Sequence, residues 1–305
     1  MTLLNAPDSP QLNADPAFFH EHGYHVVRNV FSQAEIERLR QLVFIIADHY
    51  REHGHTRIIN FKNGRKWEQI NGDYVSLPFL IELVTDVRML DIAQQVLGAT
   101  PTYFGYSQVA IGFGHSGFHR DNVDRDKSGP EWEGEGLKVV RFGLYLQDHA
   151  WHSGGLKVRA GSHKRPQGGG KEKLVDSRVG DLVLWDPRLE HSGSALRLKV
   201  APELSLQSGI ETHMPASLNK LLIRPLGQTR IFMIHDFALP NAALDHYIKY
   251  MVSERPHVRD LFLNNSHISA EKWERLNNTP GLNFMPPNEA YGKRLQGSVP
   301  TLTEA

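Results

Sequence analysis

Apolar residues in the first third of the chain recur with the period of an amphipathic helix. From Ile36 to Ile46 they return every three or four positions, a spacing that buries one face of a helix. Ser32 and Glu35 precede this stripe in a capping-box pattern, in which the hydroxyl and the carboxylate each accept a hydrogen bond from the first turn. We therefore expect a helix that begins after Ser32.

A short strand and a second helix are expected in the same region. Segment 24–27 is aromatic and β-branched and follows Gly23, which predicts a strand. From Asp86 to Leu97 the helical spacing returns, with Thr85 as the expected N-cap and Gly98 as the residue that ends the helix.

After about Pro101 the pattern changes from helical to extended. Short β-branched and aromatic runs are separated by Gly, Pro and Asp, which predicts strands. No helix is expected between most of them, so the pattern favours an antiparallel sandwich, jelly roll or barrel over a parallel sheet. The expected strands lie within 102–113, 137–147, 155–161, 180–186 and 230–237.

The expected elements fit one domain over residues 1–305. We divide it into a mostly helical N-terminal part (18–100), a mainly β core (101–237) and a helical C-terminal extension with a polar tail (238–305).

Composition excludes several classes of protein. Apolar residues make up 40% of the chain and charged residues 22%, so a core can be buried. The 34 basic and 34 acidic residues cancel, which removes the electrostatic case for a nucleic-acid partner. The lack of cysteine excludes disulfides, Cys-ligated zinc and thiol catalysis. No apolar run is long enough for a membrane span and no secretory leader is recognisable, so we expect a cytoplasmic protein without a membrane partner.

The candidate chemistry lies in a His-Arg-Asp triplet. The chain holds 17 histidines, so only a histidine in a constrained pattern is informative. On an extended segment His119 and Asp121 point to the same side. His191, just after an expected strand, is a candidate third ligand that a barrel would bring close.

Two histidines and one carboxylate on one face of a metal leave positions open, an arrangement typical of non-haem Fe(II). A 2-oxo acid fills two of the open positions and dioxygen the third. Oxidative decarboxylation of the acid then produces an oxidant able to remove hydrogen from an unactivated C–H bond. A fourth protein ligand would block this sequence.

Longer blocks around these residues resemble a known family. They are "FFHEHGYHVVRNVFSQAEIERLRQLV" from Phe18, "HRD", "SGGLKVRAGSHK" (153–164) and "GDLVLWDPRLEHSG" (180–193). The chain over most of 18–237 resembles the phytanoyl-CoA dioxygenase-like (PhyH) family of Fe(II)- and 2-oxoglutarate-dependent oxygenases. The resemblance implies a double-stranded β-helix, which is a cupin-like jelly roll, with flanking helices. It also implies that His119, Asp121 and His191 bind the metal.

The resemblance further implies the reaction and the cosubstrate site. Related halogenases replace the metal-binding acid with a small residue, so Asp121 favours oxygenation, most simply hydroxylation. An arginine binds the far carboxylate of 2-oxoglutarate through its planar fork, and the family places it about ten residues after the second histidine. This chain has no arginine there. We prefer Arg230, which opens an expected strand, over Arg197.

Other residues are expected to support the site. Gln108 is a candidate donor to the cosubstrate, and Arg141, in the most apolar strand, either binds an anion or pairs with an internal acid. Tyr106 and Trp132 are candidate pocket residues. The insertion 194–229 is too long for a simple turn, and we expect it to act as a lid over the substrate.

The leading hypothesis is an oxygenase with Fe(II), 2-oxoglutarate and dioxygen that hydroxylates a small or medium-sized organic molecule. Two alternatives remain: a cupin-like metal-dependent isomerase or hydrolase, and a non-catalytic jelly-roll binding module. Substrate identity and oligomeric state cannot be read from the sequence.

Overall fold

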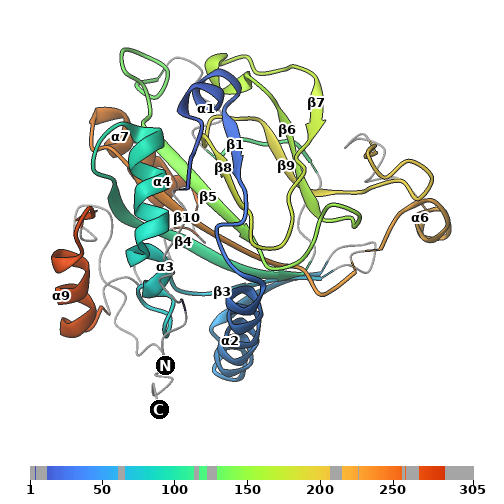
Figure 1. Ribbon diagram of the computed structural model, residues 1–305, viewed down its shortest axis with the longest axis horizontal. Helices are drawn as coiled ribbons and strands as arrows, with labels where there is room; N and C mark the ends of the chain where they lie inside the picture. The colour runs from blue at the N-terminus through green and yellow to red at the C-terminus, as the bar shows by residue number, and fades with distance from the viewer. Residues whose placement is uncertain are drawn as a thin grey trace.

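Two antiparallel sheets form the core of the protein (Figure 1). The computed structural model describes residues 4, 12–60, 66–112, 117–121, 129–206, 215–225, 227–255, 258 and 268–285. The larger sheet has the strand order β1-β8-β5-β10-β4-β3-β2, with β11 parallel to β4, and the smaller has the order β7-β6-β9. This is the predicted double-stranded β-helix with flanking helices.

The strands are β1 (Tyr24–Val27), β2 (Thr56–Asn60), β3 (Lys66–Ile70), β4 (Thr102–Gly112), β5 (Val139–Tyr145), β6 (Gly155–Arg159), β7 (Glu172–Leu174), β8 (Leu182–Trp185), β9 (His191–Ala195), β10 (Ile231–Ala238) and β11 (Asn283–Phe284). The helices are α1 (Pro16–His22), α2 (Gln33–Glu52), α3 (Ile81–Thr85), α4 (Val87–Leu97), α6 (Ala216–Leu222), α7 (Ala242–Glu254) and α9 (Ala270–Asn278), with a 3-10 turn at Ser162–Lys164.

The predicted capping box begins α2. The Ser32 hydroxyl accepts a hydrogen bond from the Glu35 amide at 3.3 Å, and the Glu35 carboxylate accepts one from the Ser32 amide at 2.8 Å. The apolar face, which includes Ile36 and Ile46, is buried against the large sheet. The expected helix and its cap are therefore confirmed.

The N-cap expected for α4 was wrong by one residue. Asp86 caps this helix, because its carboxylate accepts a hydrogen bond from the Arg88 amide at 2.9 Å. Thr85 is the last residue of α3, and its hydroxyl donates to the Ile81 carbonyl. Gly98 ends α4 in the left-handed conformation, as expected.

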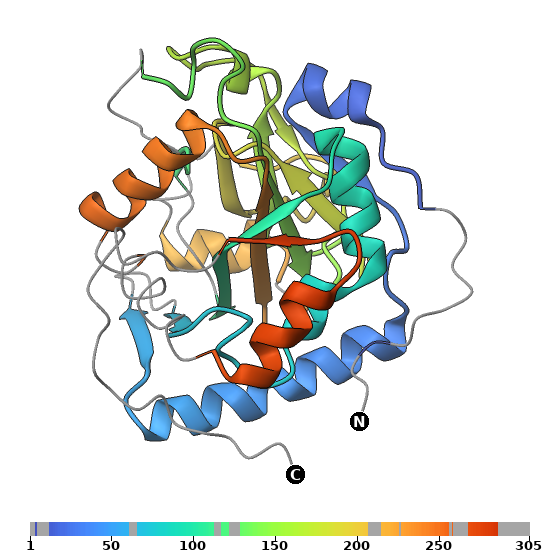
Figure 2. The ribbon, with the colours of Figure 1, turned by 90° about the vertical axis from the view of Figure 1, so that its left-hand side faces the viewer.

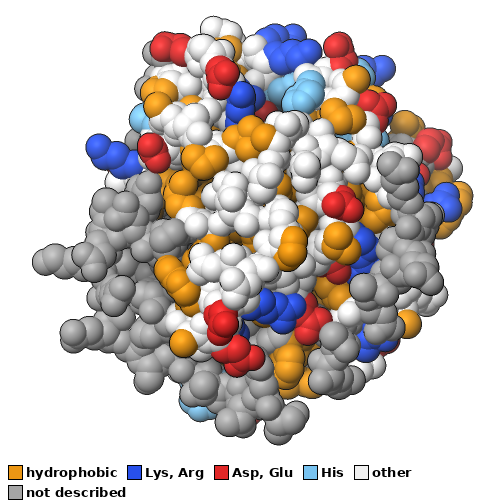
Figure 3. Space-filling model, turned by 60° about the vertical axis from the view of Figure 1, so that its left-hand side comes forward, with side chains coloured by type: hydrophobic (Ala, Val, Ile, Leu, Met, Phe, Trp, Pro, Cys, Tyr) orange, Lys and Arg blue, Asp and Glu red, His pale blue; other side chains and the backbone are white. Residues whose placement is uncertain are grey.

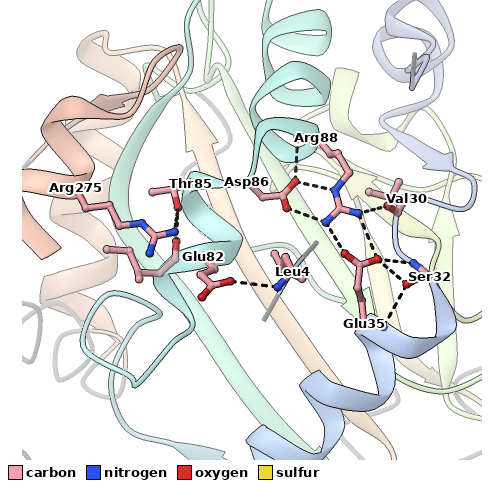
Figure 4. A network of polar contacts seen from close by, with 10 residues as sticks. Leu4, Val30, Ser32, Glu35, Glu82, Thr85, Asp86, Arg88 and Arg275 are labelled. Atoms are coloured by element: carbon pink, nitrogen blue, oxygen red, sulfur yellow. Dashed lines mark hydrogen bonds and ion pairs between the residues drawn. The ribbon is translucent and has the colours of Figure 1, made fainter. Parts of the chain in front are cut away.

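A buried ion network ties these helices together (Figure 4). Arg88 contacts Glu35 at 2.9 Å and Asp86 at 2.8 Å and donates to the Val30 carbonyl at 3.0 Å. Its guanidinium also lies 4.4 Å from the ring centre of Phe31. The network links the start of α2, the loop before it and the start of α4.

Alternation along the strands of the large sheet divides the core into two layers. Residues such as Phe142, Leu184 and Met233 face α2, α3 and α4 in one cluster. Residues at the alternate positions of these strands, such as Tyr145 and Trp185, face the small sheet and α7 in a second cluster. The space between the two sheets is where the site lies.

The C-terminal extension returns to the large sheet (Figure 2). Helix α7 is the expected helix after β10, while α9 leads into β11, which pairs with β4. The end of the expected polar tail, 286–305, lies outside the described residues. On the face in Figure 3, basic and acidic side chains are interspersed. No helix in the described residues is long and apolar enough to cross a membrane.

Candidate active site

A cavity of about 500 Å³ opens between the two sheets. Its floor is one face of the large sheet, to which the alternating residues Tyr106 and Gln108 of β4 and Phe232 and Ile234 of β10 contribute. This volume is typical of a small-molecule site.

A single antiparallel bridge places the histidines of the predicted site together. The His119 amide donates to the His191 carbonyl at 3.0 Å, and the His191 amide donates back at 2.9 Å. The Asp121 amide donates to the Pro187 carbonyl at 2.8 Å. The extended segment 119–121 therefore runs beside the start of β9, and its two outer side chains share one side, as predicted.

The three side chains converge on one point. Ligand atoms of His119, Asp121 and His191 all lie within 4.8 Å of one another. The Nε2 atom of His191 is 3.3 Å from the Asp121 carboxylate and that of His119 is 3.8 Å from it. These are the candidate metal ligands of the sequence analysis, gathered at the cavity wall.

Backbone carbonyls orient both imidazoles. His119 Nδ1 is 3.1 Å from the Gly117 carbonyl and His191 Nδ1 is 3.0 Å from the Leu189 carbonyl. Because a carbonyl can only accept, each Nδ1 donates, which leaves Nε2 as the nitrogen that is turned toward the other candidate ligands. Burial also lowers the pKa of His191 to about 4, so this ring is neutral at pH 7. The His191 ring thus has the neutral form that binds a metal.

Asp121 is held ionised by its surroundings. Burial alone would raise its pKa, but Arg141 and the two histidines hold the pKa well below the usual range. Arg141 Nη1 is 2.5 Å from the carboxylate, and the Trp185 Nε1 is 3.4 Å from it. The Trp185 ring lies over Gly143, where any Cβ would overlap it. Gly143 therefore permits the position of a tryptophan that contacts the candidate ligand.

Arg141 pairs with internal acids, which was one of the two roles expected for it. Its Nε and Nη2 contact both oxygens of Asp236 at 2.7 Å, and Nη2 also contacts the Tyr247 hydroxyl at 3.0 Å. The guanidinium stacks on Tyr106, 4.6 Å from the ring centre. Arg141 thus bridges Asp121 and Asp236 at the cavity wall.

Arg120, between the two candidate ligands, points away from them. Its guanidinium donates to the carbonyls of Ser162, Arg165 and Pro166 at 2.6–3.2 Å. This fixes segment 119–121 to the turn after β6.

Arg230 is a buried cation that lines the same cavity. It donates to the backbone carbonyls of Gly154 at 2.9 Å, Gly193 at 2.7 Å and Gly112 at 3.3 Å. Within the described residues no carboxylate pairs with it. Burial lowers its pKa, while the neighbouring Tyr145 hydroxyl raises it. A buried guanidinium without a counter-ion is a fit partner for an anion.

The other expected residues divide into two groups. Gln108, Tyr106 and Arg141 line the cavity, whereas Arg197 and Trp132 do not. Arg197 donates to the Pro202 carbonyl at 2.6 Å, and the Trp132 ring lies under Arg120.

The expected lid is only partly described. Of the insertion 194–229, residues 207–214 and 226 lie outside the described residues, and none of the described ones lines the cavity. The insertion includes α6 and a small cluster of its own around Leu196 and Ile223.

Sequence reasoning missed several residues that line the cavity. Arg57, Ile59 and Trp67 come from the β2–β3 hairpin, and Arg255 follows α7. The hairpin had a signal in the Asn63-Gly64 dipeptide between two β-branched or aromatic runs. Arg255 had none, since its place depends on how α7 packs.

Fold and site define a double-stranded β-helix protein with a cluster of two histidines and one carboxylate. The sequence model of the family described as phytanoyl-CoA dioxygenase (PhyH) matches residues 19–197, more than half of the chain. The chain belongs to this family, one of the Fe(II)- and 2-oxoglutarate-dependent oxygenase families.

Two solved structures, each with a TM-score of 0.50, share the fold. EctD from S. alaskensis, with 2-oxoglutarate and 5-hydroxyectoine, is 15% identical with a TM-score of 0.50, over 78% of this chain and 80% of that one. AviO1 from Streptomyces viridochromogenes Tue57 is 18% identical with a TM-score of 0.50, over 77% and 98%. SnoK, a carbocyclase of nogalamycin biosynthesis, is 16% identical with a TM-score of 0.49, over 75% and 87%. A comparison with curated proteins found no match.

Proposed function

We propose that this protein is an Fe(II)- and 2-oxoglutarate-dependent dioxygenase that hydroxylates a small or medium-sized organic substrate, with release of succinate and carbon dioxide. The observation that carries the proposal is the convergence of two imidazoles and one carboxylate, within 4.8 Å, on the wall of a cavity. The family, and an EctD structure of the same fold with 2-oxoglutarate, support it.

His119, Asp121 and His191 would hold the iron. Two imidazoles and one ionised carboxylate are the ligand types that suit Fe(II) in an open site. When bound, the metal supplies dioxygen activation coupled to decarboxylation of the 2-oxo acid. Arg141 and Trp185 keep Asp121 ionised and oriented through direct contacts.

Arg230 would bind the far carboxylate of 2-oxoglutarate. Three carbonyls fix the guanidinium in place, and its burial makes a carboxylate partner favourable. Gln108 lines the same cavity and is an additional donor in our proposal. Arg197 stands outside the cavity, so its position favours Arg230 for this role.

The reaction that we propose at the substrate is hydroxylation. Asp121 occupies the place that a small residue takes in halogenases of related type, which favours transfer of oxygen. The aromatic and apolar side chains of Phe232 and Ile234 line the cavity and provide an apolar surface for the carbon skeleton of a substrate.

The decisive experiment measures succinate from 2-oxoglutarate, with Fe(II) and a library of organic acids, amines and neutral compounds. We expect oxygen-dependent succinate and a product that gains one oxygen atom, both lost in Asp121→Ala. Turnover of a compound without dioxygen would favour the isomerase or hydrolase. Binding of compounds without any turnover would favour the non-catalytic module.

A further inference from the structure

The charged side chains that line the cavity are mostly arginines. Among the described lining residues, Asp121 is the sole carboxylate. The arginines are Arg57, Arg120, Arg141, Arg230 and Arg255.

Three of these arginines already have defined roles. The Arg120 guanidinium binds backbone carbonyls, and Arg141 forms ion pairs with Asp121 and Asp236. Arg230 is the proposed partner of the far carboxylate of 2-oxoglutarate.

Arg255 is a half-buried cation beside the metal ligands. It caps α7, and its Nη2 makes a 3.3 Å hydrogen bond to the Arg120 carbonyl. Burial would lower its pKa, but Asp121 nearby raises it, so the guanidinium stays charged. It forms no ion pair with a described carboxylate at hydrogen-bond distance. Its charge is therefore available at the cavity wall.

Arg57 supplies a second cation from another element. It lies on β2, opposite Gln69 of β3, and its exposed side chain makes no hydrogen bond or ion pair with the described residues. In Figure 2, β2 and the end of α7 both lie on the left of the molecule. Ile59 and Trp67, directly paired across β2 and β3, add apolar wall beside Arg57.

We infer that the substrate is an organic oxyanion, a carboxylate or phosphate monoester, whose charged end is bound by Arg255 with help from Arg57 and whose apolar body lies on Trp67 and Phe232. This inference rests on the proposed function, because it assigns Arg230 to the cosubstrate. Arginine suits both anions through its planar donor fork. A neutral substrate would give neither guanidinium a carboxylate partner at hydrogen-bond distance within the described residues, whereas an oxyanion would provide one.

The test compares matched probes by calorimetry on the anaerobic protein with Fe(II), with and without 2-oxoglutarate. The probes are 3-phenylpropanoate, phenyl phosphate and the neutral 3-phenylpropanamide. We expect an acid to bind at least tenfold more tightly than the amide, the scale of a hydrogen bond between charged groups. Whichever acid binds better identifies the oxyanion.

Variants then locate the anion. Arg255→Gln should remove most of the preference for the acid, Arg255→Lys should restore part of it, and Arg57→Gln should weaken it a few-fold. Arg275→Gln removes one positive charge far from the cavity lining and should change nothing. Circular dichroism checks that each variant folds.

The inference fails if neither acid binds better than the amide, or if Arg255→Gln keeps the full preference. The two proposals fail separately. If 2-oxoglutarate does not bind, the proposed function fails, while the acid preference is still measured without it. If Arg255→Gln weakens the binding of 2-oxoglutarate but not that of the probe acid, Arg255 binds the cosubstrate and the inference is overturned.

Discussion

His119 and His191 exchange both backbone hydrogen bonds of a single antiparallel bridge, although they lie far apart in sequence. The bridge brings their rings to a centroid distance of 4.4 Å. The geometry of the candidate metal ligands therefore depends on the backbone pairing as well as on the side chains.

Arg230 and Arg197 should differ sharply in their effect on the cosubstrate. Arg230→Leu removes the buried guanidinium and should raise the KM for 2-oxoglutarate at least tenfold, as expected for a lost charged hydrogen-bond pair. Arg197→Leu is the matched control and should leave this KM unchanged. A larger rise of this KM in Arg197→Leu would assign cosubstrate binding to Arg197 and contradict the role proposed for Arg230.

Gly143→Ala should disturb the candidate metal site by displacing Trp185. A Cβ at this position overlaps the Trp185 ring, so the indole must move away from Asp121. We expect a stability loss of about 1–3 kcal/mol and weaker metal binding, measured by urea unfolding and metal titration. Gly193→Ala, whose Cβ would be 3.8 Å from Arg230, should be milder. Equal effects of the two variants would contradict this account.

Arg88→Met should be strongly destabilising. It leaves the buried carboxylates of Glu35 and Asp86 without their cation, which costs about 3–5 kcal/mol in comparable pairs. Urea unfolding measures the loss. Arg275→Met, which removes an exposed hydrogen bond to Thr85, should stay within about 0.5 kcal/mol of wild type.

His235 should make the protein less stable in acid. Burial lowers its pKa from 6.5 to about 3, so between these values the unfolded chain binds a proton that the folded chain does not. The free energy of unfolding should therefore fall as the pH drops from 6.5 toward 3. Above pH 6.5 the contribution of the neutral His235 ring to stability should be fully present. Each pKa unit corresponds to about 1.4 kcal/mol.

Unfolding of the His235→Gln variant across this range provides the check. Its stability should depend less steeply on pH than that of wild type, while the exposed His20→Gln should follow wild type. Parallel curves for wild type and His235→Gln would show that this ring does not contribute.

Local signals in the sequence were sufficient for much of the fold. The Ser32–Glu35 capping box gave the start of α2, and the β-branched runs gave the main strands. The H-x-D spacing placed His119 and Asp121 on one side, and His191 was a candidate from its place after an expected strand and from the family resemblance. Each of these depends on residues close in sequence or on a motif.

Features that depend on packing were not predictable in the same way. Strand β2 is largely exposed, so it shows little alternation, and β7 has three residues. The partner of Arg141 is Asp236, which only the register of β5 with β10 brings opposite it. Thr85 cannot cap α4 because it is the last residue of α3, so Asp86 takes this role.

Anaerobic calorimetry with Fe(II) is the most direct test of the three-ligand site. We predict one metal ion per chain in wild type and at least tenfold weaker binding in His119→Ala, Asp121→Ala and His191→Ala, with His20→Ala as the control. Binding of one Fe(II) with wild-type affinity in all three folded variants would contradict the assignment.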